Sequence, residues 1–258
     1  MTAVANEGVD VDPTVGLAVR DVSVSFSGLK ALDGVTFDVP GGGVTALIGP
    51  NGAGKTTLLN CISGLYQSTG ELFLDGTALS DIEPHQRSRR GIARTFQTPS
   101  LLDDHPAVDN VMLGGHSSGR RQTGGRAARP SERELRERSM SLLDRFGIAH
   151  LAPVRVGDLP HADRRRVETA RALVSEPRVV LLDEPAAGLD EDEARDLLAV
   201  AAELSDTCVL VEHNMSLVMS VAQFVVVLAA GRVLATGTAA EVRENPAVIE
   251  AYLGDEVA

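Results

Sequence analysis

The stretch Gly49-Pro-Asn-Gly-Ala-Gly-Lys-Thr-Thr57 decides how the rest of the sequence is interpreted. It fits the pattern G-x-x-x-x-G-K-[S/T], follows the apolar run Val44-Thr-Ala-Leu-Ile48, and leads into a predicted helix from Thr57. Gly52 and Gly54 allow the backbone to curl so that successive N–H groups point at one anion. The helix N-terminus adds its own unpaired donors. A strand, a glycine loop and a helix in this order predict a nucleotide-binding loop.

Individual residues of this loop fit individual tasks. We expect Lys55 to reach the β- and γ-phosphates and the Thr56 hydroxyl to bind Mg²⁺. The alternative, a glycine-rich turn without a ligand, does not account for a lysine and a hydroxyl at these two positions. The full set of loop residues predicted to bind the cofactors ATP and Mg²⁺ is Gly49, Asn51, Gly52, Ala53, Gly54, Lys55, Thr56 and Thr57.

Length and composition restrict the class of protein. At 258 residues and 43% apolar content, the chain is long enough for one large domain or a core domain with an inserted lobe. A net charge of −12 argues against nucleic acid as a partner, since phosphate backbones require a basic surface. No apolar run is long enough to cross a bilayer, and residues 1–15 are predicted to be a disordered tail. Cys61 and Cys208 have no partner pattern and are predicted to be buried, reduced thiols.

The first part of the chain alternates short strands and turns. Strands are predicted over Leu17–Phe26, Val35–Val39 and Gly70–Gly76, with turns at Ser27–Gly28 and Asp33–Gly34. The first two strands are expected to form an antiparallel unit that opens the domain. This unit precedes the strand of the glycine loop.

The composition changes at about residue 83, and a helical lobe is predicted up to about residue 173. A short helix is expected at Val108–Leu113, followed by a flexible Gly-, Ser- and Arg-rich loop over Gly114–Pro130. Ser131 and Glu134 have the spacing of a capping box and predict the start of a longer helix. A further helix is predicted over Arg164–Val174.

The second half alternates strands and helices, a pattern that predicts a parallel sheet with helices on both faces. The predicted strands are 178–183 and 208–212, a pair of strands at 224–228 and 233–235, and the predicted helices are 191–204, 214–221 and one from Asn245 to near Leu253.

Polar side chains follow two of these strands. Asp183 fits a Mg²⁺ ligand, and Glu184 fits the group that orients or deprotonates an attacking water. His213 ends the next strand and is expected at the same sheet edge, where it can bond the γ-phosphate. Gln97 carries a side-chain carbonyl that can bind Mg²⁺ or water. Acidic residues that only end a strand, and a histidine with a purely structural role, are the alternatives.

From Leu17 to Gly254 the sequence resembles the ATP-binding subunits of ABC transporters. Gly49–Thr57 is similar to the Walker A loop of that family, Gln97 to its Q-loop glutamine, and Leu181-Leu-Asp-Glu-Pro185 to its Walker B motif. Ala186-Ala-Gly-Leu-Asp190 resembles the D-loop with its Asp190, and His213 the switch histidine. The resemblance also implies that Phe26 stacks on adenine. It assigns catalytic roles to Glu184, His213 and Gln97, and Mg²⁺ binding to Thr56, Gln97 and Asp183.

The fold implied is α/β: a P-loop ABC-type ATPase core with an antiparallel β subdomain and an inserted helical subdomain. The expected organisation is a single ABC ATPase domain over residues 16–254, with the helical subdomain at about 84–173 and tails at 1–15 and 255–258. Within the family, the segments Gly28–Gly34, Ala93–Gln97 and Val242–Gly254 resemble importers of branched-chain amino acids. ATPases of urea, amide and lipopolysaccharide transporters are similar.

One motif departs from the family pattern. The family signature is Leu-Ser-Gly-Gly-Gln, and this chain has Leu159-Pro160-His161-Ala162-Asp163 in its place. In the family, the signature serine and glycines contact the γ-phosphate of an ATP held by the other subunit. Pro160 has neither hydroxyl nor N–H, and Ala162 and Asp163 add a methyl group and a negative charge. His161 and Arg164 are possible substitutes. We expect the segment to keep its structure and lose part of its phosphate contact.

The sequence therefore predicts an ATPase that powers a membrane transporter from the cytoplasmic face of the membrane. The resemblance implies an importer of branched-chain amino acids or a similar small solute. The predicted partners are membrane-spanning permease subunits, contacted through residues 98–111, and a second ABC ATPase subunit, with a heterodimer favoured by the altered signature. Two alternatives stay open. One is an ABC ATPase without a membrane partner, and the other is a regulatory subunit that holds ATP without hydrolysing it.

Overall fold

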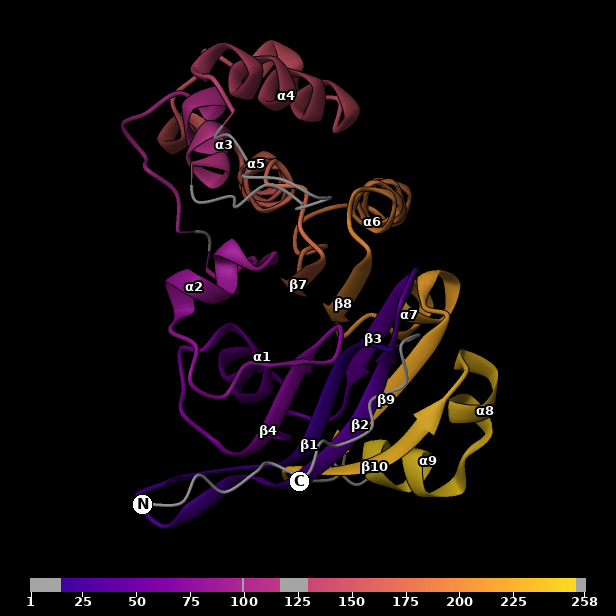
Figure 1. The fold of residues 1–258 in the computed structure, drawn as a ribbon. Coiled ribbons are helices and arrows are strands. Elements are labelled where there is room, and N and C mark those ends of the chain that lie inside the picture. The colour runs from indigo at the N-terminus through magenta and orange to yellow at the C-terminus, as the bar shows by residue number, and fades with distance from the viewer. Residues whose placement is uncertain (1–14, 99, 117–129, 254–258) are drawn as a thin grey trace, which may run out of the picture.

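The computed structural model describes residues 15–98, 100–116 and 130–253 (Figure 1). The tails predicted at 1–15 and 255–258 fall outside these ranges, apart from Val15. Most of the loop predicted at 114–130 also falls outside them. The described residues form two sheets with helices around them, and the α/β fold predicted from the sequence is confirmed.

The larger sheet has six strands in the order β10-β9-β3-β8-β7-β6. Strands β6, β7, β8, β3 and β9 run parallel, and only β10 is antiparallel to its neighbour β9. The strands are β3 (Val44–Ile48), β6 (Ile92–Arg94), β7 (Val179–Asp183), β8 (Thr207–Val211), β9 (Phe224–Ala229) and β10 (Arg232–Gly237). The sequence did not predict β6, which has three residues and therefore no measurable periodicity.

The smaller sheet is antiparallel, with the order β2-β1-β4-β5. Its strands are β1 (Val15–Phe26), β2 (Leu29–Pro40), β4 (Thr69–Leu74) and β5 (Thr77–Ala78). The turn predicted at Asp33–Gly34 is wrong, because β2 runs through it. The pairing moves from Val22↔Val35 to Val24↔Leu32, so β2 carries one extra residue there, a β-bulge. Gly34 has φ +68° and supplies the conformation that the bulge requires.

Side chains of the central strands alternate between two hydrophobic cores, as the period of a strand requires. In β7, Val180 and Leu182 pack with the helices of the second half, whereas Val179 and Leu181 face the smaller sheet. Both faces of the sheet are therefore covered, which explains why β3, β7 and β8 are buried at every residue.

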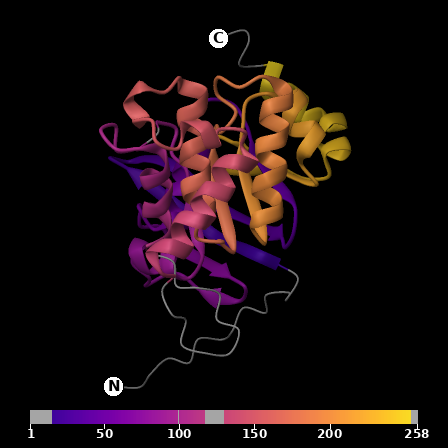
Figure 2. The ribbon, with the colours of Figure 1, turned by 90° about the horizontal axis from the view of Figure 1, so that it is seen from above.

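Helices α3, α4 and α5 gather at one end of the molecule, away from β1, β2 and β4 (Figure 1). Figure 2, which looks from above, shows the pink and orange helices in front of the indigo strands. Helix α5 begins at His161, three residues before the predicted start, and α2 and α8 were not predicted. The helices are α1 (Lys55–Ser63), α2 (Pro84–Arg89), α3 (Ala107–Gly115), α4 (Glu132–Arg145), α5 (His161–Leu173), α6 (Glu191–Leu204), α7 (Met215–Val221), α8 (Ala239–Glu244) and α9 (Pro246–Leu253), with short 3₁₀ turns at Ala149–Leu151 and Val156–Asp158.

The structure agrees with two local predictions from the sequence, the capping box at Ser131 and the buried cysteines. Ser131 caps α4, and its side chain accepts from the Glu134 amide while Glu134 reaches back to the Ser131 amide. Cys61 and Cys208 are both buried and free, as predicted. Burial raises the pKa of the Cys61 thiol to about 11 and that of Cys208 to about 12, which keeps both uncharged and unreactive at neutral pH.

A buried arginine closes the C-terminal end of α1. Arg87 donates to the carbonyl oxygens of Cys61, Ile62, Leu79 and Ile82, at distances between 2.6 and 3.0 Å. Two of these carbonyls belong to the last turn of α1, where few backbone donors remain; that of Cys61 also accepts from the Gly64 amide at 3.0 Å. Arg87 therefore joins α1 to the segment that leads into α2.

Replacing this arginine tests that interpretation. Arg87→Met should lower the free energy of unfolding by about 3 kcal/mol, because several buried carbonyls lose a charged donor. Arg89→Met is the control, since Arg89 is exposed two residues along the same helix. Urea unfolding of both variants checks the prediction, and equal midpoints for the two would contradict it.

Candidate active site

The glycine loop lies between two strands with no room for side chains at two of its positions. A Cβ on Gly49 would overlap the carbonyl oxygen of Leu228 in β9, and φ is +145° there. A Cβ on Gly54 would lie 2.7 Å from the carbonyl oxygen of Ala31 in β2, with φ +101°. Both positions require glycine for conformation and for space. The loop is therefore fixed against both sheets.

Helix α1 starts directly after this loop and has no side-chain cap at its N-terminus. Its first main-chain bond runs from Leu58 N to Gly54 O, so the amides of Thr56 and Thr57 lie before the first bond within the helix. Lys55 is buried, and its ammonium group donates to the carbonyls of Gly49 at 2.6 Å and Pro50 at 2.9 Å. The lysine thus holds the loop closed and keeps a positive charge beside the first amides of the helix, an arrangement suited to an anion.

Adjacent strands bring the other predicted residues to the same edge of the sheet. β7 and β8 neighbour each other, and β8 also neighbours β3, so Asp183, Glu184 and His213 follow strands beside the glycine loop. Glu184 Oε1 lies 2.8 Å from His213 Nε2 and 3.4 Å from Gln97 Nε2. The structure therefore gathers all three predicted catalytic side chains around one carboxylate oxygen.

Glu184 has an unusual backbone conformation. Its φ is +52°, and residues other than glycine rarely adopt this region. Its N–H nevertheless donates to the Val211 carbonyl at 2.9 Å. Strain of this kind is maintained only where the surroundings fix the residue, and it is common at active sites. The conformation ends the strand and directs the carboxylate to His213 and Gln97.

Asp183 has one oxygen bound and one without a partner. Its Oδ2 lies 3.3 Å from Arg94 Nη2, while Oδ1 is buried and has no partner among the described residues. Burial raises the pKa of this carboxyl and Arg94 opposes the shift. Asp183 lines a pocket of about 400 Å³ together with Thr56 and Gln97. An orphaned carboxylate oxygen beside a hydroxyl and an amide suits a hard divalent cation.

The described residues contain no cluster of three or more Asp, Glu, His or Cys side chains that could hold a metal by itself. Mg²⁺ characteristically binds through one or two carboxylates together with the phosphates of a nucleotide. A site with a single carboxylate and a hydroxyl therefore fits Mg²⁺ delivered with its nucleotide.

Sequence reasoning missed two residues of this site. Arg94 is buried and donates to Asn60 Oδ1 at 2.6 Å and Ser63 Oγ at 3.0 Å, so it joins β6 to α1 as well as to Asp183. Glu212 is buried and accepts from the Ala186 amide at 3.0 Å, which fixes the segment after Glu184. Their charge at the end of a buried strand was the available signal, but charge alone does not identify a partner.

Phe26 lies apart from this cluster, at the end of β1. Its ring is 45% exposed and meets Tyr66 edge to face, with centroids 5.2 Å apart at 72°. Two partly exposed aromatic rings offer a surface for a base. Tyr66 was not singled out from the sequence, and the stacking role of Phe26 stays a prediction.

The altered signature lies at the start of α5. Pro160 is the N-cap residue and makes no side-chain cap bond, so the helix starts without one. Asp163 does not present a bare charge, since its Oδ1 accepts from Arg166 at 2.8 Å. Arg164 is paired with Asp103 at 2.6 Å. The substitute role predicted for Arg164 would require this partly exposed ion pair to open, at a cost of about 1 kcal/mol or less.

The segment similar to the D-loop packs beside this helix start. A Cβ on Gly188 would lie 3.4 Å from His161 Nδ1, so the two segments nearly touch. Asp190 caps α6, and its Oδ1 accepts from the Glu193 amide at 2.8 Å. The signature-like and D-loop-like segments thus form one surface, with Leu159 buried beneath it.

Comparisons with known proteins agree with this geometry. Residues 32–187 match the family model described as ABC transporter, and residues 232–258 match one described as branched-chain amino acid ATP-binding cassette transporter. The chain belongs to the ABC transporter ATPases. ATP hydrolysis coupled to transport is the activity of this family, and no described helix is long and apolar enough to span a membrane.

Relatives in this family are similar over nearly their whole length. The high-affinity branched-chain amino acid transport ATP-binding protein BraF of Pseudomonas aeruginosa is 41% identical, with 93% of this chain and 98% of BraF covered. LivG of Escherichia coli, of the same description, is 37% identical with the same coverage. A solved ATP-binding cassette of an ABC transporter in its ADP conformation superposes with a TM-score of 0.80 at 30% identity, covering 93% of this chain and 99% of that one.

Lys55→Ala should abolish measurable ATP binding, because the loop loses the positive charge that faces the phosphates. Lys30→Ala is the matched control, since Lys30 is the only other lysine and its exposed side chain pairs with Asp33. Titration with a fluorescent ATP analogue checks both variants. Binding by Lys55→Ala within twofold of the wild type would remove Lys55 from the phosphate site.

Proposed function

We propose that this chain hydrolyses MgATP to power the import of branched-chain amino acids through separate membrane permease subunits, at the cytoplasmic face of the membrane. The proposal rests on one observation: the side chains of His213 and Gln97 both lie within hydrogen-bond distance of Glu184 Oε1, at the sheet edge beside the glycine loop. The substrate class rests on the relatives, which are described as branched-chain amino acid transport proteins.

In this proposal the loop holds the phosphates and the strand ends perform the chemistry. The amides at the start of α1 and the ammonium of Lys55 bind the β- and γ-phosphates. Phe26, with Tyr66 beside it, supports the adenine. Loop residues Asn51, Gly52, Ala53 and Thr57 complete the binding segment.

Thr56, Asp183 and Gln97 are the residues that would hold Mg²⁺, which neutralises charge on the phosphates when bound. Glu184 accepts the proton of the attacking water, and its strained backbone keeps its carboxylate at one place. His213 donates to Glu184 and is exposed enough to reach the γ-phosphate. Gln97 donates to the same carboxylate and fixes it from the other side.

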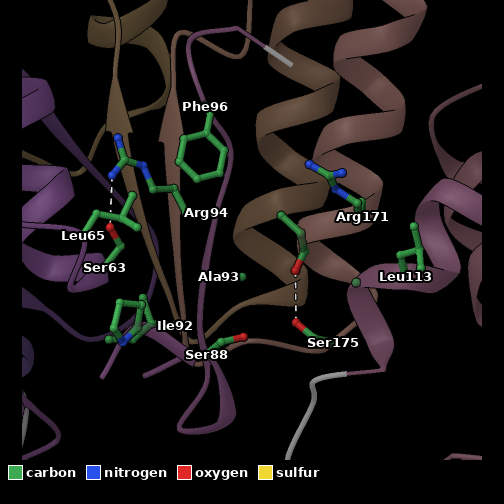
Figure 3. Close-up of a pocket in the computed structure, with 13 residues that line it drawn as sticks. Ser63, Leu65, Ser88, Ile92, Ala93, Arg94, Phe96, Leu113, Arg171 and Ser175 are labelled. Atoms are coloured by element: carbon green, nitrogen blue, oxygen red, sulfur yellow. Dashed lines mark hydrogen bonds between the residues drawn. The ribbon is translucent and has the colours of Figure 1, made fainter. Parts of the chain in front are cut away.

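A groove of about 380 Å³ between the core and the helical lobe is the proposed docking place of the permease. Figure 3 shows Leu65 and Leu113 on opposite sides of this groove, with Phe96 and Arg171 between them. Leu65 and Leu113 are 49% and 44% exposed, and apolar side chains that are exposed together at a groove are typical of protein-interaction sites. The segment that the family uses for its permease, residues 98–111, begins at the rim of this groove, with residue 99 outside the described ranges.

The experiment that tests the proposal compares Glu184→Gln with wild type in proteoliposomes that contain the permease. Glu184→Gln should bind ATP normally and hydrolyse it about 10²–10⁴-fold more slowly, with leucine uptake lost in parallel. Glu191→Gln, an exposed glutamate at the start of α6, is the control. Hydrolysis by Glu184→Gln at the wild-type rate would exclude the base role, and ATPase activity without leucine uptake in the wild type would exclude the substrate class.

The altered signature favours a second proposal, that the working unit is a heteromeric pair of ATPase subunits. In a homodimer, both ATP molecules would face a segment in which Pro160 lacks an N–H and a hydroxyl. Donors aimed at developing charge are each worth about 2.7–4 kcal/mol in an active site. A partner subunit with a regular signature would complete the site built on Lys55 and Glu184, while the partner's own ATP would face the altered segment.

The purified chain alone should therefore hydrolyse ATP at least about 10²-fold more slowly than it does with its partner ATPase. The double substitution Pro160→Ser with Ala162→Gly should raise the activity of the chain alone, because it returns a hydroxyl and removes a methyl group. Steady-state ATPase assays at concentrations that permit dimerisation measure both. Fast turnover by the unmodified chain alone would refute the heteromer.

A further inference from the structure

We propose that Arg165 and Glu168 of α5 are positioning residues that hold Gln97 beside Glu184. This inference rests on the function proposed above. The two residues are three positions apart and therefore lie on one face of the helix, together with Arg171 three positions further on. That face is turned to the segment from Phe96 to Ser100, which carries Gln97.

The helix binds this segment through its backbone on both sides of the glutamine. Glu168 Oε1 accepts from the Phe96 amide at 3.1 Å, and Arg165 Nη1 donates to the Phe96 carbonyl at 2.7 Å. Arg165 Nη2 donates to the Gln97 carbonyl itself. Arg171 Nη1 adds a bond to the Ser100 carbonyl at 2.5 Å. Main-chain groups of three residues are thus attached to one helix.

Arg165 and Glu168, which we call the clamp, are charged and buried. The side chains of Arg165 and Glu168 are 4% and 1% exposed and lie 3.3 Å apart. Burial raises the pKa of Glu168, and the Phe96 amide and Arg165 oppose that shift. A buried ion pair is weak evidence for stability, since an apolar pair of similar size often packs as well. The hydrogen bonds from this pair to the segment that carries Gln97 explain why the pair is buried here better than a contribution to stability does.

The ring of Phe96 is held separately. The guanidinium group of Arg94 lies 5.0 Å from the centre of the ring, in a cation–π contact, while Arg94 is bound to Asp183. Figure 3 shows the two side chains next to each other at the groove. Backbone bonds from α5 and a ring contact from Arg94 therefore fix the residue that precedes Gln97. The Gln97 side chain is left free to bond Glu184.

Kinetics of three variants test the clamp against a merely structural role. Arg165→Met should lower kcat by about 10- to 100-fold with the KM for ATP within twofold, since small displacements of a catalytic group are costly and the phosphate loop is untouched. Arg165→Lys should recover part of the loss, because an ammonium group keeps the charge but cannot bind both carbonyls in the same fork geometry. Val167→Ala, in the core on the same helix, is the control. It should lower Tm without lowering kcat.

A rate loss in Arg165→Met no greater than that in Val167→Ala at equal Tm would overturn the proposal. A rise in KM at constant kcat would overturn it as well. If Arg165→Met does not fold, Glu168→Gln serves in its place, since it keeps an acceptor for the Phe96 amide and removes the charge that Arg165 faces. It should give a smaller loss of kcat in the same direction.

A second readout does not depend on ATP hydrolysis. The chain has no tryptophan, so Phe96→Trp introduces a single tryptophan into the clamped segment, and its emission can be excited selectively over that of the two tyrosines. In this background Arg165→Met should raise the acrylamide quenching constant and Val167→Ala should not, because only the first change removes the bonds from α5 to the Phe96 and Gln97 carbonyls. Equal quenching in all three proteins would overturn the proposal. An inactive wild type would refute the function proposed above, and the quenching result would still decide on the clamp.

Discussion

The close passage of the glycine loop between the two sheets is the constraint on which this structure depends. At Gly49 the loop touches the carbonyl end of β9, and at Gly54 it touches β2 of the other sheet. Neither position has space for one carbon atom, so the loop cannot shift without moving a strand. The chain also joins the sheets directly here, since Asp33 N bonds Gly231 O and Gly231 N bonds Ala53 O. The position of α1, and of the anion site at its N-terminus, follows from this contact.

Strand order then decides which side chains reach that site. β3 lies beside β8, and β8 beside β7, so three strands distant in the sequence end next to one another. In a parallel sheet those ends share one edge, where ligands bind. Hydrogen bonds keep these strand ends in register. The Glu184 amide donates to the Val211 carbonyl, and the Asp183 amide donates to Thr95 Oγ1 at 3.1 Å. The strand order therefore brings the site residues to one edge of the sheet, and their side chains make the final contacts with one another.

The sequence predicted those parts of the fold whose signal is local. The glycine loop, the apolar strands β3, β7 and β8, and the capping box at Ser131 each depend on residues within about ten positions. It failed where a distant segment decides the outcome. Asp33–Gly34 has the composition of a turn and forms a bulge, because β1 pairs across it. β6 is too short to show a period, and only its pairing with β7 makes it a strand. The partners of Arg94 and Arg165 could not be predicted for the same reason, since they lie 89 and 69 residues away along the chain.

The start of α5 shows how the altered signature is compatible with the fold. Proline at the N-cap position fixes φ at −54° and leaves the helix to begin at once with His161. The amides of His161, Ala162 and Asp163 then precede the first intrahelical bond, which Arg164 N makes to Pro160 O. Three backbone donors at this end therefore do not depend on the side chains that changed, and Arg166 offsets the charge of Asp163. Compared with the family signature, proline at position 160 removes two donors, one side-chain hydroxyl and one backbone N–H. In the heteromeric arrangement proposed above, the backbone amides of this helix start would still attract phosphate, because they do not depend on the changed side chains. The lost donors would matter for the rate, since they are contacts that strengthen in the transition state.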